Sequence, residues 1–333
     1  MSRTYDIYGV GHALVDIQYS VPVPLLAELG IDKGVMTLID EERQQVILGA
    51  LTQDPIASAS GGSAANTMIG AAGFGGRAYY ACQLGEDEWG DFYRKDLESA
   101  GVHSNPANRV PGRTGQCVVF ITPDADRPLN TFLGVSSSIG PNQLEETQIA
   151  ASQYLYLEGY LLSSDSGFAA CRRAQDIARQ QRTAVSLTLS DPFMIATHRE
   201  RFTELVATGV DLLFCNEDEA RAYTGLEDRE AACTALASQV GIACITCGAE
   251  GAILYEGGQR IHIPGIPVKA VDTTGAGDLF AGGLLFGITN GYSLEAAGKL
   301  GSYAAAQVVA QYGPRLNRPL ADEIDSILAR FAH

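Results

Sequence analysis

The chain has 333 residues and a formal net charge of −16, with 23 Lys and Arg residues against 39 Asp and Glu residues. This length can bury a large core, either as one α/β domain with an appended subdomain or as two domains. The acidic balance disfavours sequence-independent binding to nucleic acid or to an anionic membrane, because phosphate-rich partners attract basic surfaces. We therefore expect a small-molecule partner, with no nucleic acid and no membrane.

Two features of the sequence bear on the cellular compartment. The opening stretch MSRTYDIYGVGHALVD lacks the pattern of a secretory signal, and no later apolar run is long enough to cross a bilayer, so a cytoplasmic location is expected. The seven scattered cysteines are unlike a disulfide framework, and most are predicted to be buried, reduced thiols. CITC at 244–247 matches C-x-x-C, but residues three apart on a strand point to opposite faces, and no second pair completes a zinc site.

Short apolar runs typical of buried strands alternate with segments of helical periodicity. Strand–helix alternation predicts an α/β fold with a mostly parallel sheet and helices on both faces. In such sheets, ligands bind in the loops beyond the carboxyl ends of the strands. The predicted strands lie within 5–19, 184–190, 209–220 and 243–255, and the predicted helices within 63–75, 165–181 and 228–241.

The stretch GVGHALVD at 9–16 follows the first predicted strand. Gly9 and Gly11 have the G-x-G spacing of a dinucleotide fingerprint, but Leu14 stands where the third glycine belongs. Asp16 also comes too soon to be the ribose-binding acid of that fingerprint. A short carboxylate here is instead well placed to accept hydrogen bonds from two neighbouring sugar hydroxyls. The alternative is a turn or cap residue.

Two β-prone segments, 15–42 and 114–135, interrupt the strand–helix alternation. Their alternating runs and turn residues predict that they pair as a small antiparallel sheet, which would form a lid. The alternative is that they extend the edge of the main sheet. We predict one large α/β domain over 1–333 with a discontinuous lid at approximately 16–40 and 112–134.

The stretch SGGSAANTMIGAA at 60–72 places two glycines before a helix. At Gly61 and Gly62 the backbone can approach a ligand closely, while Asn66 offers both a donor and an acceptor, a combination that suits a hydroxyl. The alternative is tight packing of a helix rich in small residues.

Two further stretches are candidates for a nucleotide site. In NEDEA at 216–220, Asn216 and Glu219 have the spacing of a helix cap, and both could also hold Mg²⁺ through its waters. In TCGAEGAILY at 246–255, Thr246, Gly248 and Gly251 lie at a predicted turn between strands. These small residues would let a nucleotide bind close to the main chain, and the alternative is a simple hairpin. The sequence contains no G-x-x-x-x-G-K-[ST], so any ATP site is not of the P-loop type.

The stretch AVDTTGAGDLFAGGLL at 270–285 places Gly275, Ala276 and Gly277 at the start of an apolar helix. A helix N-terminus has unpaired N–H groups and a positive dipole end, and small residues let an anion approach them. Asp278 beside that anion would be repelled unless it had a chemical task. We predict that it takes a proton from a hydroxyl that attacks a phosphate, the alternative being an ordinary first-turn acid.

Taken together, these motifs resemble the PfkB, or ribokinase-like, family of carbohydrate and nucleoside kinases, in the family's order, from about residue 5 to 330. The resemblance implies a ribokinase-like three-layer sandwich with a mostly parallel central sheet and a small β lid. It implies ATP and Mg²⁺ as cofactors, an anion hole at Gly275, Ala276 and Gly277, and Asp278 as catalytic base. The matching stretches are GG with Asn66 at 61–66, GEDEWG at 85–90, NEDE at 216–219, TCGAEG at 246–251 and DTTGAGD at 272–278.

The resemblance also assigns binding roles to the other candidates. Asp16 and Asn66, with the amides of Gly61 and Gly62, would hold the ribose hydroxyls, and Arg127 would approach the phosphates. Magnesium would be held through water by Glu219 and Asn216. The residues implied for ATP or phosphate are Arg127, Asn216, Thr246, Gly248, Gly251 and Thr274.

The subgroup is indicated by GVGHALVDI, KGVMTLID, TGQCVVFITPDADRPLNTFLG and GSYAAAQVVAQYGPRL, which resemble the adenosine-kinase-like branch. This implies phosphorylation of the 5′-hydroxyl of a purine nucleoside, with adenosine as first choice and Met36, Cys117 and Phe132 around the purine. Inosine, guanosine, or a free sugar such as ribose or fructose are the alternatives. An inactive nucleoside-binding homologue would have lost the base or the anion-hole glycines, and both are present here.

The resemblance further implies a monovalent cation such as K⁺ beneath the anion hole. Its oxygen ligands would be Asp272, Thr274 and the backbone around Gly313, with Arg315 as a partial replacement. The protein is expected to be a monomer or a homodimer.

Overall fold

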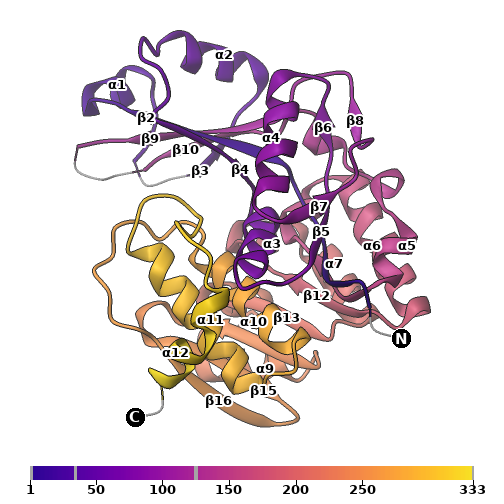
Figure 1. Cartoon of the computed structure of the whole chain (residues 1–333). Helices are drawn as coiled ribbons and strands as arrows, with labels where there is room; N and C mark the ends of the chain where they lie inside the picture. The colour runs from indigo at the N-terminus through magenta and orange to yellow at the C-terminus, as the bar shows by residue number, and fades with distance from the viewer. Residues whose placement is uncertain (1–2, 34–35, 124–126, 332–333) are drawn as a thin grey trace.

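The computed structural model describes residues 3–33, 36–123 and 127–331 (Figure 1). Its large sheet has nine strands in the order β16-β15-β14-β13-β12-β11-β1-β5-β7. All neighbours from β14 to β7 are parallel, and only β15 and β16 run antiparallel to their neighbours. The strands are β1 (Tyr5–Val10), β5 (Ala78–Ala81), β7 (Val102–Ser104), β11 (Ser152–Leu157), β12 (Ala184–Thr188), β13 (Leu212–Asn216), β14 (Ile242–Thr246), β15 (Gly251–Glu256) and β16 (Gln259–Pro264).

Helices cover both faces of this sheet, which makes three layers. Successive residues of β1 show the reason: Ile7 enters a core with α3 and α10, whereas Tyr8 enters a separate core with α6 and α7. The three predicted helices form as α3, α6 and α9. The helices are α1 (Val23–Glu28), α2 (Glu41–Gly49), α3 (Ser63–Gly73), α4 (Glu88–Ser99), α5 (Glu146–Ala150), α6 (Asp165–Gln181), α7 (Pro192–Thr208), α8 (Glu217–Thr224), α9 (Arg229–Ala237), α10 (Ala276–Thr289), α11 (Leu294–Val309) and α12 (Ile324–Ala329).

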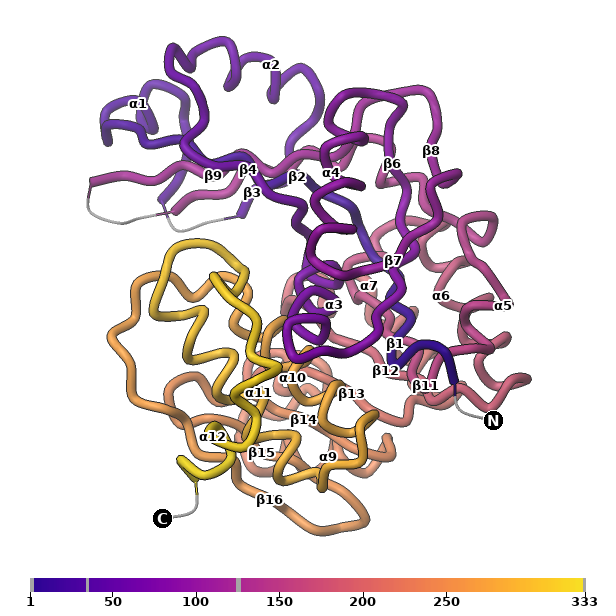
Figure 2. Tube along the Cα trace, in the orientation of Figure 1, coloured from indigo at the N-terminus to yellow at the C-terminus, as the bar shows by residue number. Residues whose placement is uncertain are grey.

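A second, five-stranded sheet, here called the small sheet, has the order β3-β10-β9-β2-β4. Figure 2 shows it beside the body formed by the large sheet, with α1 and α2 over its outer side. It is a separate sheet, so the alternative that these segments extend the main sheet is wrong. Its strands are β2 (Leu14–Ser20), β3 (Met36–Leu38), β4 (Ala57–Gly61), β9 (Gly115–Ile121) and β10 (Leu129–Phe132).

The predicted pairing within the small sheet is wrong in direction. The two β-prone segments meet through parallel pairs, β2 with β9 and β3 with β10. The antiparallel pairs are β9 with β10, and β2 with β4, a strand that was not predicted. The long connection between the two segments passes through the large sheet, so no short hairpin forces them to run in opposite directions.

The remaining elements are short, and the cysteines are structural. Cys244 and Cys247 belong to different cores, as the strand alternation predicts, and all seven cysteines are buried and unpaired. Within the described ranges, no helix is long and apolar enough to span a membrane. The short elements are β6 (Leu84–Gly85), β8 (Arg109–Val110), η1 (Gly134–Ser138), η2 (Pro141–Gln143), η3 (Gly159–Ser163), η4 (Gly248–Glu250) and η5 (Ala321–Glu323).

Candidate active site

A cavity of about 390 Å³ is lined by residues of the small sheet, by the loops beyond β11 and β12, and by the N-termini of α3 and α10. It lies where ligands are expected in an open α/β sheet. The cavity brings together ten of the predicted site residues: Asp16, Met36, Gly62, Asn66, Cys117, Thr274, Gly275, Ala276, Gly277 and Asp278.

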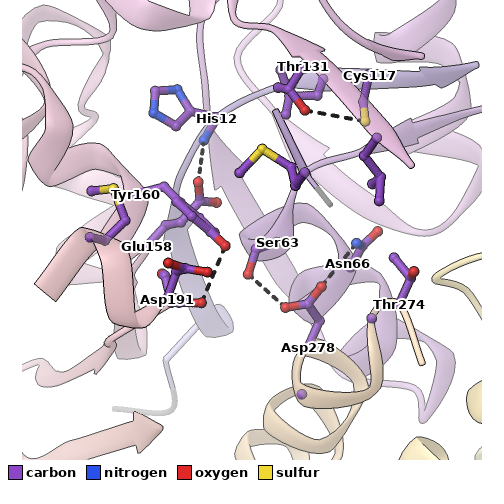
Figure 3. Close-up of a pocket in the computed structure, with 18 of the residues that line it drawn as sticks. His12, Ser63, Asn66, Cys117, Thr131, Glu158, Tyr160, Asp191, Thr274 and Asp278 are labelled. Atoms are coloured by element: carbon purple, nitrogen blue, oxygen red, sulfur yellow. Dashed lines mark hydrogen bonds between the residues drawn. The ribbon is translucent and has the colours of Figure 1, made fainter. Parts of the chain in front are cut away.

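Asp278 lies in the first turn of α10, and both of its carboxylate oxygens are held by α3. The Ser63 hydroxyl donates to Oδ1 at 2.7 Å, and the Asn66 amide donates to Oδ2 at 3.1 Å (Figure 3). Loss of solvation raises the pKa of Asp278 to about 6, although these two hydrogen bonds oppose the rise. The carboxylate is therefore fixed in orientation and has a pKa suited to accepting a proton near neutral pH.

The small-residue run forms a tight entry into α10. Gly275 is the N-cap residue with a φ of +78°, and a Cβ there would collide with Pro314. Only glycine combines this left-handed backbone with so close a neighbour. At Gly277 nothing lies within 4 Å of the Cβ position, so the backbone remains open toward the cavity. The geometry fits an anion site at a helix N-terminus.

Asp16 and Asn66 occupy the wall beside Asp278. A Cβ at Gly61 would collide with the carboxylate of Asp16, so the glycine allows Asp16 to lie against β4. Burial raises the pKa of Asp16 to about 7, with Arg315 and Arg127 opposing the rise. The Oδ1 of Asn66 is buried without a protein partner among the described residues, because only its amide nitrogen is used on Asp278.

Several cavity residues were not predicted. Ser63 could have been found as the helix's first residue after the glycine pair, and Glu158 and Asp191 as carboxylates in the loops after β11 and β12. No motif in the sequence marks His12, which contacts Ser136 from a distant segment. The additional lining residues include His12, Leu14, Leu38, Ser63, Leu129, Leu133, Glu158, Tyr160, Ser190, Asp191, Phe193 and Met194.

One residue predicted to contact the purine lies outside the cavity. Phe132 does not line the cavity, whereas Leu129, Thr131 and Leu133 do. Side chains alternate along a strand, so Phe132 points to the opposite face of the small sheet. There it packs beneath the Arg113 guanidinium, 5.6 Å from the ring centre. The sequence alone does not show which face of the small sheet Phe132 occupies.

Apart from Thr274, the residues predicted for ATP or phosphate do not line this cavity. Asn216 and Thr246 are neighbours at the carboxyl ends of β13 and β14. Asn216 and Glu219 form the capping box: the Glu219 amide donates to Asn216 Oδ1 at 2.8 Å, and Glu219 accepts from the backbone and side chain of Asn216. Gly248 and Gly251 flank the turn between β14 and β15, where a Cβ at Gly251 would collide with backbone.

The residues implied for a monovalent cation have other partners in this structure. Asp272 forms a buried ion pair with Arg127, and it also accepts from the backbone amides of Thr274 at 3.0 Å and Gly313 at 2.8 Å. Arg315, the predicted replacement, is instead paired with Asp96 at 2.7 Å. The positive charge beside Asp272 is a guanidinium.

Comparison with known proteins agrees with this geometry. A family model described as pfkB family carbohydrate kinase matches residues 39–321, which include the small-residue run and Asp278. The chain belongs to the PfkB family. This PfkB protein is therefore a sugar or nucleoside kinase, a phosphotransferase with a hydroxyl group as acceptor.

Three relatives show how the family resemblance extends along the chain. The structure of adenosine kinase from Sinorhizobium meliloti is 37% identical, with a TM-score of 0.89 over 97% of this chain and 99% of that chain. A probable sugar kinase from Rhizobium etli is 36% identical, with a TM-score of 0.91 over 98% and 100%. The adenosine kinase of Saccharomyces cerevisiae is 28% identical over 332 residues, covering 93% of this PfkB protein and 96% of the yeast protein. The predicted ribokinase-like fold is thus confirmed.

Proposed function

We propose that this PfkB kinase transfers the terminal phosphoryl group of ATP to the 5′-hydroxyl of a purine nucleoside, with adenosine as the first choice. One observation carries the proposal. The same cavity holds a helix N-terminus with Asp278, a polar wall with Asp16 and Asn66, and an apolar wall with Leu38 and Phe193. These parts match a phosphoryl group, a sugar and a flat base, respectively.

The reaction uses Asp278 as general base. Its carboxylate accepts the proton of the attacking 5′-hydroxyl, and the oxygen then attacks the γ-phosphorus in line with the leaving ADP. Amides of the run from Gly275 to Gly277 stabilise the charge that spreads over the equatorial oxygens. Asp16 accepts from ribose hydroxyls, and the free Oδ1 of Asn66 is a further acceptor for one of them.

The surroundings of Glu219 fit a magnesium ion bound through water. Glu219 is only 6% exposed, and burial raises its pKa to about 7, with Asp191 and Asp278 adding to the rise. Among the described residues, no group of three or more His, Cys, Asp or Glu side chains could hold a metal ion directly, so a magnesium ion here would depend on its retained waters. Magnesium would neutralise charge on the phosphates. Glu219 and Asn216 would hold its waters, and Asp191 would face it from the cavity wall.

Arg127 would complete the phosphate site only by exchanging partners. In this structure its guanidinium is paired with Asp272, two residues before the cavity-lining Thr274. A triphosphate at the α10 N-terminus offers the Arg127 guanidinium a competing anion. We propose that Arg127 contacts the phosphates after this exchange.

The apolar wall favours a nucleoside over a free sugar. Phe193 is 71% exposed and Leu38 is 54% exposed, and both line the cavity. A purine that contacts these side chains removes apolar surface from water, and its face can stack on the ring of Phe193. A free pentose held at Asp16 and Asn66 would leave that surface exposed. The Sinorhizobium relative carries the name adenosine kinase, which supports the same choice.

The proposal is tested by measuring ADP release with adenosine, inosine, guanosine, cytidine, ribose and fructose as acceptors, with the Asp278→Asn variant as the blank. We expect the highest kcat/KM with a purine nucleoside. A higher kcat/KM with ribose or fructose than with every purine nucleoside would overturn the substrate assignment and favour the free-sugar alternative. That alternative has support from the Rhizobium relative, which is named a probable sugar kinase.

A further inference from the structure

Residues 313–315, in the loop that follows α11, support the entry into α10. The amide of Gly313 donates to Asp272 Oδ2 at 2.8 Å. Pro314 lies against Gly275, where a Cβ would be only 2.7 Å from the Pro314 Cβ. Asp272 and Gly275 belong to the segment that forms the proposed anion hole. The loop after α11 therefore holds the phosphate half of the site in place.

The next residue of the same loop, Arg315, reaches α4 and β4. Its Nη1 donates to Asp96 Oδ2 at 2.7 Å, and its Nη2 donates to the hydroxyl of Ser60. Ser60 donates to the same Asp96 oxygen, from its amide at 2.7 Å and from its hydroxyl at 2.8 Å. Although burial alone would raise the pKa of Asp96, Arg315 and Ser60 hold it below its ordinary value. The three residues thus form one charged hydrogen-bond network.

This network lies beside the acceptor half of the site. Ser60 precedes Gly61 on β4, and a Cβ at Gly61 would be only 2.2 Å from Asp16 Oδ2. Strand β4 also pairs with β2, which carries Asp16. The position of β4 therefore limits where the Asp16 carboxylate can lie, and the contacts of Arg315 with Ser60 and Asp96 fix that position.

We propose that Arg315 is a positioning residue that fixes the acceptor-binding wall at Asp16 relative to the anion hole at Gly275. This inference rests on the proposed role of Asp16 in binding the acceptor. Arg315 does not line the cavity, so it acts through other residues. In-line transfer requires the attacking oxygen and the phosphorus to be held in register, and a misplacement of about 1 Å can lower the rate by about 10²-fold.

The charge of Arg315 gives this role a measurable signature. Burial raises the pKa of Asp16 to about 7, and Arg315 comes first among the charges that oppose the rise. Without the guanidinium, more of Asp16 would be protonated at pH 7, and a protonated carboxyl is a poorer acceptor for the sugar hydroxyls. The other titratable or charged groups around Asp16 are Arg127 before β10, Asp278 on α10, Cys117 on β9 and Tyr93 on α4, and burial keeps the last two protonated by raising their pKa values.

The test compares Arg315→Gln and Arg315→Lys. The matched control is Arg318→Gln, an exposed arginine of the same segment that is paired with Glu323. For each protein, kcat and kcat/KM for adenosine are measured against pH, and the ATP dissociation constant is measured by calorimetry. The control should match the unaltered protein in every measurement.

We expect Arg315→Gln to lower kcat/KM at pH 7 by about tenfold or more, and to move the upper inflection of its acid limb upward by about one pH unit. The pH profile of kcat, which depends on Asp278, should keep its shape, and the ATP dissociation constant should change by less than about twofold. Arg315→Lys keeps the charge, so the inflection should stay in place. A single ammonium group cannot reproduce the forked contact with Asp96 and Ser60, so part of the loss in kcat/KM should remain.

Two results would overturn the inference. One is an unchanged kcat/KM in Arg315→Gln, and the other is an equal weakening of ATP and adenosine with the inflection unmoved, which would show a merely structural role. If Asp16→Ala leaves KM for the acceptor unchanged, the proposed role of Asp16 fails instead. Should Arg315→Gln not fold, as judged by thermal unfolding, Arg315→Lys decides: an unchanged kcat/KM overturns the inference, and a several-fold loss with ATP binding intact supports it.

Discussion

The hydroxyl of Ser63 donates a 2.7 Å hydrogen bond to Oδ1 of Asp278, which joins the first residue of α3 to the first turn of α10. These residues are 215 positions apart in the chain. The orientation of the proposed base therefore depends on how two helices pack, as well as on its own motif. Asn66, one turn further along α3, holds the other carboxylate oxygen from the same side.

Replacing the proposed base should abolish chemistry and preserve binding. Asp278→Asn keeps the shape of the side chain but cannot take the proton, so kcat should fall by at least ~10². Adenosine and ATP dissociation constants, measured by calorimetry, should change only a few-fold. Asp325→Asn, at an exposed position on α12, is the control and should retain full activity. Near-normal turnover in Asp278→Asn would remove Asp278 from its assigned role.

The rate should depend on the ionisation of this carboxyl. The pKa of Asp278 is raised to about 6, mainly by burial, and only the ionised form accepts a proton. We expect log kcat to fall with a slope near one as the pH drops below about 6, and to level off above about 7. kcat is the quantity to measure, because the raised pKa of Asp16, about 7, affects substrate binding. A kcat that is flat between pH 5 and 8 would contradict this assignment.

The same shift predicts an effect on stability in the absence of ligands. A native pKa above the ordinary value means that ionisation of Asp278 costs the native state free energy as the pH rises toward and through about 6. Asp278→Asn removes this cost and should raise Tm at pH 7, with little effect at pH 4, where the carboxyl is already protonated. Scanning calorimetry at the two pH values checks the prediction. If Asp278→Asn has a lower Tm than the unaltered protein at pH 7, the prediction is wrong.

Asp16 is expected to act on the acceptor and not on ATP. Asp16→Ala removes the carboxylate that would accept from the ribose hydroxyls and leaves those hydroxyls unpaired in the cavity. We expect KM for adenosine to rise by about tenfold or more, with the ATP dissociation constant unchanged within about twofold. Titration of the variant with each ligand separates the two effects. Equal weakening of ATP and adenosine would place Asp16 in the wrong half of the site.

Glu219→Gln separates the magnesium role from the helix-cap role. Glutamine retains an oxygen that can accept from the Asn216 backbone, so α8 should keep its cap, but the negative charge is lost. We expect the Mg²⁺ concentration for half-maximal rate to rise by about fivefold or more, since oxygen anions attract the hydrated ion. Asp218→Gln, on the exposed side of the same first turn, is the charge-matched control. An unchanged magnesium requirement would leave Glu219 as a cap residue only.

The sequence by itself determined the fold class and the elements that form it. Apolar runs and helical periodicity predicted α6 and the strand before α8, because these patterns follow from burial of one face of each element. The run from Gly275 to Asp278 pointed to an anion site for a local reason: backbone amides at a helix start need no distant partner to be available. The chemistry of this run could therefore be predicted from a short segment of the sequence.

Tertiary structure decided everything that depends on two segments meeting. It placed Phe132 outside the cavity, because the face that a strand presents depends on its register with its neighbours. It also brought Phe193, on α7, to the cavity. It paired Asp272 with Arg127 from the small sheet, where the sequence resemblance implied a monovalent cation. It brought Nδ1 of His12 to 3.2 Å from the carbonyl oxygen of Ser136, 124 positions away in the chain. Such long-range contacts arise only when the two sheets are assembled, so no local pattern in the chain encodes them.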